Sequence, residues 1–421
     1  MTTTDTPTVR PTGLTGRAPA PDLARGFMLL FIALANTPFY LYGREQSEAG
    51  FHPVDGSVSD KVVQAFTIIV VDLRAYPMFA VLFGYGLVMI YRRQQEAGRS
   101  ERDAFRLLQR RNLWLLVFGA VHALLLSGGD VLGAYGLCGL LMVWLFLRRS
   151  DRALKIVIWI GTGLLVALAA LTAFSLLSYL AADDPVSTDG GGALPEIFFE
   201  DATSESYLTT ALVRIMTWPM MVLLIQGPVT LVVPVSILVS VLLARHRVLK
   251  EPGRHRRLLR TLAVTGIGIA WVGALPHALA HIGVIEGLDD VIGVFAAIQL
   301  ATGLAGGVGY AALFGLIGHR VSARSQGTLG SVGTLGPVGS AISALGKRSM
   351  TGYLAQSVIF TPLLAAWGFG LGASLTSTTM ALVAVGGWLV TVALAVAMER
   401  RNYRGPAETL MRRLVYRPTR Q

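Results

Sequence analysis

A histidine and an aspartate eight positions apart in this sequence could perform chemistry together. His122 lies within the apolar run 112–127, and Asp130 follows at the turn after that run. A histidine that a carboxylate orients is the arrangement that general-base chemistry uses. A packed histidine bonded to a backbone carbonyl fits the spacing equally well, so the sequence leaves both interpretations open.

A second set of polar groups accompanies the first apolar segment. Asp22 and Arg25 are three residues apart, so on a helix they share a face where this segment begins. Asn36 follows deeper in the same segment. Polar groups at such depth are costly in lipid and usually face a protein interior or a wet cavity. The alternatives are a boundary ion pair for Asp22 and Arg25 and an interhelical hydrogen bond for Asn36.

Two further polar groups are expected near the outer side of the membrane. Asp72 and Arg74 either close the same cavity as His122 or form an interfacial ion pair. His277 and His281 are four residues apart on one helix face, a spacing that can bind a metal. Because no third ligand follows at a fixed offset, we predict no metal site.

The sequence motifs of soluble enzymes are absent. The glycine-rich segments lack a Walker lysine, and there is no Gly-x-Ser-x-Gly, His-Glu-x-x-His or Cys-x-x-Cys pattern. The single cysteine, Cys138, lies inside an apolar run, which argues against a thiolate nucleophile. We therefore predict no cofactor.

Composition identifies the class of protein. Hydrophobic residues make up 53% of the chain and charged residues only 14%, and apolar blocks long enough to cross a bilayer recur to the end. The net charge of +11 falls in short clusters between these blocks, so it indicates topology rather than nucleic-acid binding. We predict an integral membrane protein whose partner is the lipid bilayer.

The apolar runs predict an all-α bundle of about ten transmembrane helices, with eight or nine as the alternatives. The predicted spans are 26–43, 70–91, 112–127, 131–147, 154–180, 218–244, 261–283, 291–318, 349–371 and 377–398.

Loop charges predict the orientation of these spans. Basic clusters follow every second span, whereas the alternate loops are neutral or acidic, and residues 181–206 hold no Lys or Arg. By the positive-inside rule, both termini are cytoplasmic. The expected location is a bacterial cytoplasmic membrane.

The chain also divides by composition. Residues 58–72 and 200–217 are amphipathic and are expected along the outer interface. We predict four parts: a disordered cytoplasmic tail (1–20), an N-terminal bundle (21–325), a flexible Gly-rich linker (326–345) and a two-span segment with a basic amphipathic tail (346–421).

Several blocks of this sequence resemble the YeiB-like membrane family, known as domain of unknown function 418. They occur in the expected order along nearly the whole chain, at 22–36, 79–86, 110–122, 129–135, 346–357 and 404–412.

That family is similar to membrane acyltransferases, in which an inner donor such as an acyl-CoA serves an acceptor on the far side. One related branch carries a catalytic histidine eleven residues beyond the arginine of its opening motif, where this chain has Asn36. A neutral amide can orient groups or stabilise an oxyanion, but it cannot act as the base. His122 with Asp130 is then the best remaining base.

The resemblance implies transfer of an acyl group from a cytoplasmic acyl-CoA to a lipid-linked, glycan or small-molecule acceptor. A transporter or exporter, and a non-catalytic membrane partner, are the alternatives, and the oligomeric state is left open. The expected catalytic residues are Asn36, His122 and Asp130, and the expected donor- or substrate-binding residues are Asp22, Arg25, Arg74, Tyr135, Tyr353 and Gln356.

Overall fold

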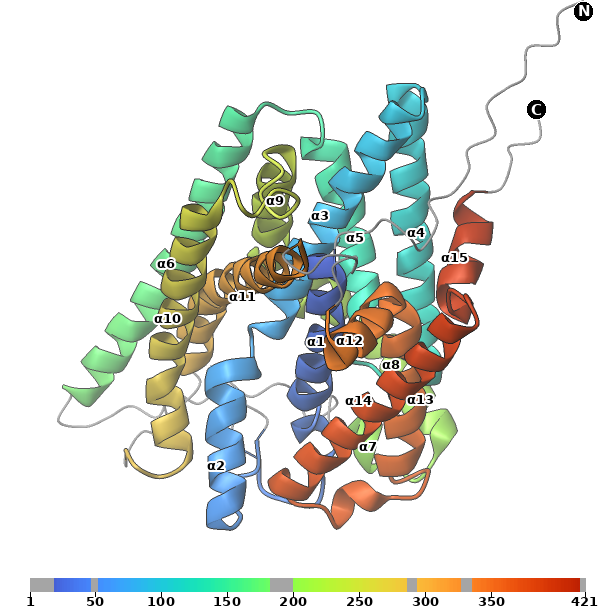
Figure 1. The fold of residues 1–421 in the computed structure, drawn as a ribbon. Coiled ribbons are helices and arrows are strands. Elements are labelled where there is room, and N and C mark those ends of the chain that lie inside the picture. Colours follow the sequence, from blue (N-terminus) through green and yellow to red (C-terminus); the bar gives the residue numbers. More distant parts are fainter. Residues whose placement is uncertain (1–18, 47–51, 182–199, 286–293, 327–334, 417–421) are drawn as a thin grey trace, which may run out of the picture.

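The computed structural model describes residues 19–46, 52–181, 200–285, 294–326 and 335–416, and these are helical almost throughout (Figure 1). Within them the one β pairing is an isolated bridge between Gln46 and Pro53. The helices are α1 (Pro19–Ala35), α2 (Val58–Phe66), α3 (Ala75–Glu96), α4 (Glu101–Leu125), α5 (Val131–Phe146), α6 (Asp151–Leu180), α7 (Glu200–Thr203), α8 (Tyr207–Met220), α9 (Val232–Arg245), α10 (Arg256–His281), α11 (Val294–Gln326), α12 (Pro337–Lys347), α13 (Ser349–Leu364), α14 (Ser377–Arg400) and α15 (Pro406–Val415).

Short stretches of other helical type connect some of these elements. They are the 3₁₀ turns η1 (Pro38–Tyr40) and η6 (Leu371–Ala373) and the π-helical turns η2 (Thr67–Val71) and η4 (Met221–Ile225).

The helices are those of a membrane protein. Seven segments of the described chain are long and apolar enough to cross a bilayer: 20–40, 58–96, 151–178, 207–225, 256–281, 294–321 and 377–400. Two shorter apolar helices, α5 and α9, accompany them. The predicted all-α membrane bundle is confirmed.

Helix α1 occupies the middle of the bundle, with α6 and α10 on one side and α4 and α5 on the other (Figure 1). It crosses α12 at very short range because both helices carry glycine at the crossing. A Cβ atom on Gly26 would lie 2.0 Å from the carbonyl oxygen of Ile342, and one on Gly346 would lie 1.7 Å from that of Asp22. Both glycines are therefore required for this contact.

Two predicted spans change in the structure. The span predicted over 218–244 is interrupted: α8 and η4 end at Ile225, and α9 begins at Val232 after an irregular turn. The first helix ends at Ala35, so Asn36 lies just beyond its end rather than within it. Pro38 and the turn η1 follow at once. Proline has no N–H group to donate to the Leu34 oxygen, which instead accepts from the N–H group and the hydroxyl of Thr37.

Part of the predicted linker is also helical. Residues 337–347 form α12, which begins with Pro337 at its first turn and packs on α1. Residues 1–18 of the predicted tail, residues 327–334 of the predicted linker and most of the acidic loop lie outside the described residues, whereas Pro19 and Ala20, which were assigned to the tail, begin α1.

Helix α2 exposes its apolar side. Val58, Val62 and Phe66 are exposed, whereas Asp60 and Gln64 face the protein and are buried. This inverted pattern suits a helix whose outer face meets lipid.

Candidate functional site

His122, Asp130 and Ser357 form a continuous hydrogen-bonded row inside the bundle. His122 lies near the end of α4, Asp130 immediately precedes α5, and Ser357 lies in the middle of α13. His122 Nδ1 is 3.0 Å from Asp130 Oδ1, and His122 Nε2 is 2.8 Å from Ser357 Oγ. All three residues are buried.

The network assigns the proton positions in this row. The Asp130 carboxylate also accepts hydrogen bonds from the backbone N–H groups of Leu132 (3.1 Å) and Gly133 (2.7 Å) and from Trp218 Nε1 (3.3 Å). Because this carboxylate acts as an acceptor, His122 Nδ1 carries the hydrogen and Nε2 is free to accept one from the Ser357 hydroxyl. This is the arrangement of a serine nucleophile with its base and the orienting acid.

Local sequence explains how Asp130 reaches this position. It is the N-cap residue of α5, where a short side chain that accepts from the first N–H groups is favoured. Gly119 on α4 provides the space, because a Cβ atom there would lie 2.3 Å from Asp130 Oδ2. The turn and the facing glycine thus hold the carboxylate against α4.

A small cavity adjoins the Ser357 hydroxyl. Its volume is about 10 Å³, which is roughly the space of one water molecule. Gln356 donates to the backbone oxygen of Leu29 at 3.2 Å, and the Tyr40 and Thr361 hydroxyls are 3.0 Å apart. The cavity is lined by Ile32, Ala33, Asn36, Tyr40, Ser127, Tyr353, Gln356, Ser357 and Phe360.

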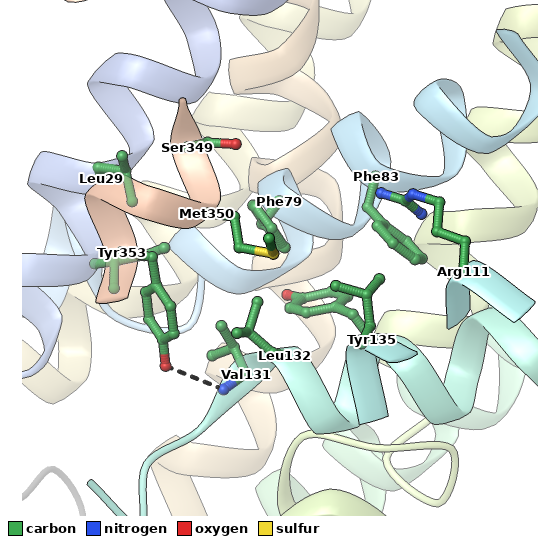
Figure 2. Close-up of a pocket in the computed structure, with 12 residues that line it drawn as sticks. Leu29, Phe79, Phe83, Arg111, Val131, Leu132, Tyr135, Ser349, Met350 and Tyr353 are labelled. Atoms are coloured by element: carbon green, nitrogen blue, oxygen red, sulfur yellow. Dashed lines mark hydrogen bonds between the residues drawn. The ribbon is translucent and has the colours of Figure 1, made fainter. Parts of the chain in front are cut away.

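A larger cavity of about 80 Å³ lies on the other side of Tyr353 (Figure 2). Its walls are mostly apolar, and Arg111 and Tyr353 lie at opposite sides of it. The Tyr135 hydroxyl donates to the backbone oxygen of Tyr76 at 2.6 Å. The lining residues are Leu29, Ile32, Phe79, Phe83, Arg111, Leu115, Val131, Leu132, Tyr135, Ser349, Met350 and Tyr353.

Asp22 and Arg25 lie near the Arg111 end of this cavity. Arg25 Nη1 is 3.2 Å from Asp22 Oδ1, and Arg25 Nη2 donates to the backbone oxygen of Leu82 at 3.3 Å. Leu82 directly precedes Phe83, a lining residue whose ring centroid is 5.2 Å from the Arg111 guanidinium carbon. Arg111 Nη1 is buried and has no hydrogen-bond partner among the described residues. Two guanidinium groups and one carboxylate therefore gather at this end.

Arg74 belongs to a different group, which we call the outer histidine cluster: His52, Asp72, Arg74, His277, His281 and Gln299. The fully buried Arg74 side chain donates to Gln299 Oε1 at 3.1 Å, to Ala270 O at 2.6 Å, and to the backbone oxygens of Ile68 and Asp72. Arg74 lines neither cavity. The structure therefore does not place it with His122.

Hydrogen-bond directions in the outer histidine cluster argue against metal coordination by His277. Arg74 can only donate, so Gln299 presents its oxygen to Arg74 and its NH₂ group to His277 Nδ1. His277 Nε2 must then carry a hydrogen and has no lone pair for a metal. Among the described residues, no group of three or more histidine, cysteine or carboxylate side chains is placed to hold a metal ion.

The rest of this cluster contains a second histidine–aspartate pair. His52 Nε2 is 2.7 Å from Asp72 Oδ2, and the ring centroids of His52 and His281 are 5.7 Å apart. The buried nitrogens His277 Nε2, His281 Nδ1 and His281 Nε2 have no hydrogen-bond partner among the described residues.

Two residues of the site were missed by the sequence analysis. Ser357 closes a block quoted for the family resemblance, but serine in a membrane helix is common, and only its distance to His122 distinguishes it. Arg111 was assigned to a basic cluster that sets topology. Its position directly before the apolar run 112–127 and its place within the family block 110–122 were the available signals.

Fold and site together define an all-α membrane protein with a buried polar site between α1, α4, α5 and α13. Residues 243–418 match the DUF418 family, which is described as a protein of unknown function. With the relatives below, this match identifies the chain as a member of the YeiB-like DUF418 family, so the family resemblance is confirmed.

Three relatives illustrate how far the similarity extends. The uncharacterized protein YxaH of Bacillus subtilis (strain 168) is 23% identical over 424 residues, which cover 97% of this chain and 96% of YxaH. The uncharacterized protein YeiB of Escherichia coli (strain K12) is 31% identical over 163 residues, 38% of each chain. An uncharacterized 39.9 kDa protein of the amylase 3' region of Bacillus acidopullulyticus is 37% identical over 133 residues, 32% of this chain and 35% of that protein. The chain thus aligns with little more than a third of two relatives and nearly all of YxaH.

Proposed function

We propose that this protein is a membrane acyltransferase in which Ser357 carries the acyl group between donor and acceptor. The observation that supports this proposal is the row Ser357–His122–Asp130, with distances of 2.8 and 3.0 Å, beside a small cavity. A serine hydroxyl is a weak nucleophile unless an adjacent base removes its proton. His122 is placed to do so, and Asp130 is placed to orient the imidazole and to stabilise its cation.

The proposed reaction has two steps. In the first, Ser357 Oγ bonds to the acyl carbon, His122 Nε2 takes the hydroxyl proton, and the bond from the acyl carbon to the donor's sulfur breaks. The thiol leaves with the proton from His122. In the second, an acceptor hydroxyl attacks the Ser357 ester, His122 takes its proton and returns it to Ser357 Oγ, and the ester bond to the enzyme breaks.

Other residues have positioning roles in this proposal. Asn36 lines the same small cavity as Ser357 and orients the acyl carbonyl. Arg25 and Arg111 bind the anionic part of an acyl-CoA at the other end of the larger cavity. The two cavities share Tyr353 and Ile32 in their linings, which supports one donor path from Arg111 to Ser357.

The proposal includes an orientation. Both termini are on the cytoplasmic side of a bacterial membrane, so the Arg25 end of the path faces the donor and the Asp130 turn lies in the outer half. This follows from the loop charges, since the basic clusters alternate with neutral or acidic loops.

The deciding experiment is to trap the acyl-enzyme. The purified protein is incubated with acyl-CoA, quenched in acid and analysed by peptide mass spectrometry, with Ser357→Ala and Ser343→Ala side by side. Ser343, on α12, is a buried serine outside both cavities and serves as the matched control. We expect acylation of Ser357 in the wild type and the control variant. An unmodified Ser357 under all donors, or a label that survives Ser357→Ala, contradicts the proposal.

A second candidate function is transport, and the outer histidine cluster supports it. Buried Arg74 and the unpartnered nitrogens of His277 and His281 are the kind of groups that line translocation paths in membranes. Flux of protons into proteoliposomes containing a pH-sensitive dye tests this candidate. Flux that His281→Ala abolishes would favour transport, and the absence of flux would exclude a proton path.

A further inference from the structure

Tyr353 lies between the two cavities. Its side chain contributes to the lining of both and is 5% exposed. Tyr353 and Ser357 are four residues apart on α13, so they share one face of that helix. The ring centroids of Tyr353 and His122 are 5.0 Å apart. The Tyr353 ring therefore stands next to the row that would perform the chemistry.

The Tyr353 hydroxyl is held by weak polar contacts. It accepts from the Val131 N–H group at 3.3 Å, as Figure 2 shows, and it is 3.5 Å from the Gly129 oxygen. Rotation of the side chain would release both contacts, and each buried group left unpaired costs about 1–3 kcal/mol. Both contacts are long, at 3.3 and 3.5 Å, so they hold the hydroxyl less firmly than short hydrogen bonds would.

The cavities on the two sides of Tyr353 differ in size and lining. The one at Ser357 holds about 10 Å³, roughly the space of one water molecule, whereas the one that reaches Arg111 holds about 80 Å³. Even a two-carbon acyl group exceeds this space while the ring stays in place, and each further carbon increases the shortfall. A longer chain would need the space that the tyrosine ring fills.

We propose that Tyr353 is a movable partition that admits the reactive end of the donor to Ser357 and restricts the acyl group to a short one. This proposal rests on the acyl transfer proposed above. The proposed substrates are short-chain acyl thioesters. The reason is that only a small volume remains for the acyl group after the ring closes over it.

Two substitutions of Tyr353 test the role of the ring and the role of the hydroxyl separately. Tyr353→Ala removes the ring and joins the two cavities. Tyr353→Phe keeps the ring and removes only the hydroxyl, so it is the matched control. Tyr353→Leu fills part of the ring volume and replaces the alanine variant if that variant does not fold, as judged by size-exclusion chromatography.

The test compares acylation of Ser357 by two-carbon and eight-carbon acyl-CoA. The wild type and Tyr353→Phe should both prefer the two-carbon donor. In Tyr353→Ala, the ratio of eight-carbon to two-carbon acylation should rise at least about tenfold, because the joined cavity buries further methylene groups, two of which suffice for a factor of this size. An unchanged ratio in the alanine variant, or an equal rise in Tyr353→Phe, would overturn the proposal.

A binding measurement keeps this test separate from that of the proposed chemistry. In the Ser357→Ala background no acyl-enzyme can form, and calorimetry then reports the affinity for each acyl-CoA. Adding Tyr353→Ala should raise the affinity for the eight-carbon donor relative to the two-carbon donor about tenfold. If the wild type is never acylated but this shift occurs, the covalent mechanism fails and the partition stands. If acylation occurs and the shift does not, the partition alone fails.

Discussion

The buried pair His122–Asp130 and the partly buried pair His52–Asp72 differ in what surrounds them. His122 and Asp130 are 3.0 Å apart, and the second histidine nitrogen meets the Ser357 hydroxyl. His52 Nε2 and Asp72 Oδ2 are 2.7 Å apart, but neither residue lines one of the two cavities, and among the described residues no hydroxyl is hydrogen-bonded to His52. A short histidine–carboxylate distance is thus common to both regions and does not define a catalytic site.

The two regions differ in whether the histidine nitrogens have hydrogen-bond partners. In the row at Ser357, both nitrogens of His122 are hydrogen-bonded, and their roles as donor and acceptor follow from the carboxylate. In the outer histidine cluster, three imidazole nitrogens of His277 and His281 lack partners. One region is therefore preorganised for a proton transfer, whereas the other has hydrogen-bonding capacity that none of its described neighbours uses.

The largest expected effect distinguishes the two histidines directly. His122→Ala should lower the rate of acyl transfer by about four orders of magnitude or more, since it removes the proposed base. His52→Ala should leave the rate within about twofold. Single-turnover transfer from acyl-CoA measures both. An equal loss of rate in the His122→Ala and His52→Ala variants would contradict a special role for His122.

A smaller loss is expected when the two carboxylates are exchanged for amides. Asp130→Asn should reduce the rate about a thousandfold, because an amide no longer imposes the required tautomer on His122. Asp72→Asn should change it little. The same single-turnover assay applies, with circular dichroism as a control for helix content. A strong effect of Asp72→Asn would place the reaction at the outer histidine cluster instead.

A substitution in the outer histidine cluster should lower the stability of the protein while leaving the rate of acyl transfer nearly unchanged. Gln299→Ala leaves Arg74 Nη1 and His277 Nδ1 each with one partner fewer, which costs about 1–3 kcal/mol for buried polar groups. We expect a lower melting temperature in detergent and an acyl transfer rate within about twofold of the wild type. Gln95→Ala, at the exposed end of α3, is the matched control. A loss of activity without a loss of stability would contradict a purely structural role for Gln299.

The smallest effect concerns the helix that carries Tyr353 and Ser357. Glu408 on α15 accepts from the backbone N–H groups of Met350 (3.0 Å) and Thr351 (3.1 Å) at the start of α13. Burial raises the pKa of the Glu408 carboxyl above its usual value, against the lowering effect of these hydrogen bonds. A raised pKa in the folded state favours folding at acid pH, and this contribution is lost as the pH rises through the raised value.

The Glu408→Gln variant tests whether ionisation of Glu408 lowers the stability of the protein as the pH rises. The variant keeps an oxygen acceptor but cannot ionise. Relative to the wild type, it should gain melting temperature at pH 7.5 and not at pH 4. Differential scanning fluorimetry across this range measures the effect. If the wild type instead gains stability relative to the variant as the pH rises, the pKa of Glu408 is lowered in the folded state and not raised.

Part of the site could be anticipated from the sequence. The eight-residue spacing of His122 and Asp130 across a turn limits their separation, and the structure brings them to 3.0 Å. Asn36, Tyr353 and Gln356 were expected from the family resemblance, and all three line the cavity at Ser357. Arg74 was expected with them and lies in the outer histidine cluster instead. Spacing along the chain could not decide this, because Arg74 meets partners from α10 and α11.

The amino-acid sequence by itself determined the class of protein and the approximate positions of its membrane helices. Hydropathy along the chain is a local property, since each span must satisfy its own backbone hydrogen bonds in lipid. The tertiary structure decided which polar side chains meet. Ser357 reaches His122 across 235 positions of the sequence. Such a contact depends on how helices pack, and here glycines at the crossing of α1 and α12 and at position 119 allow the close approaches on which that packing depends.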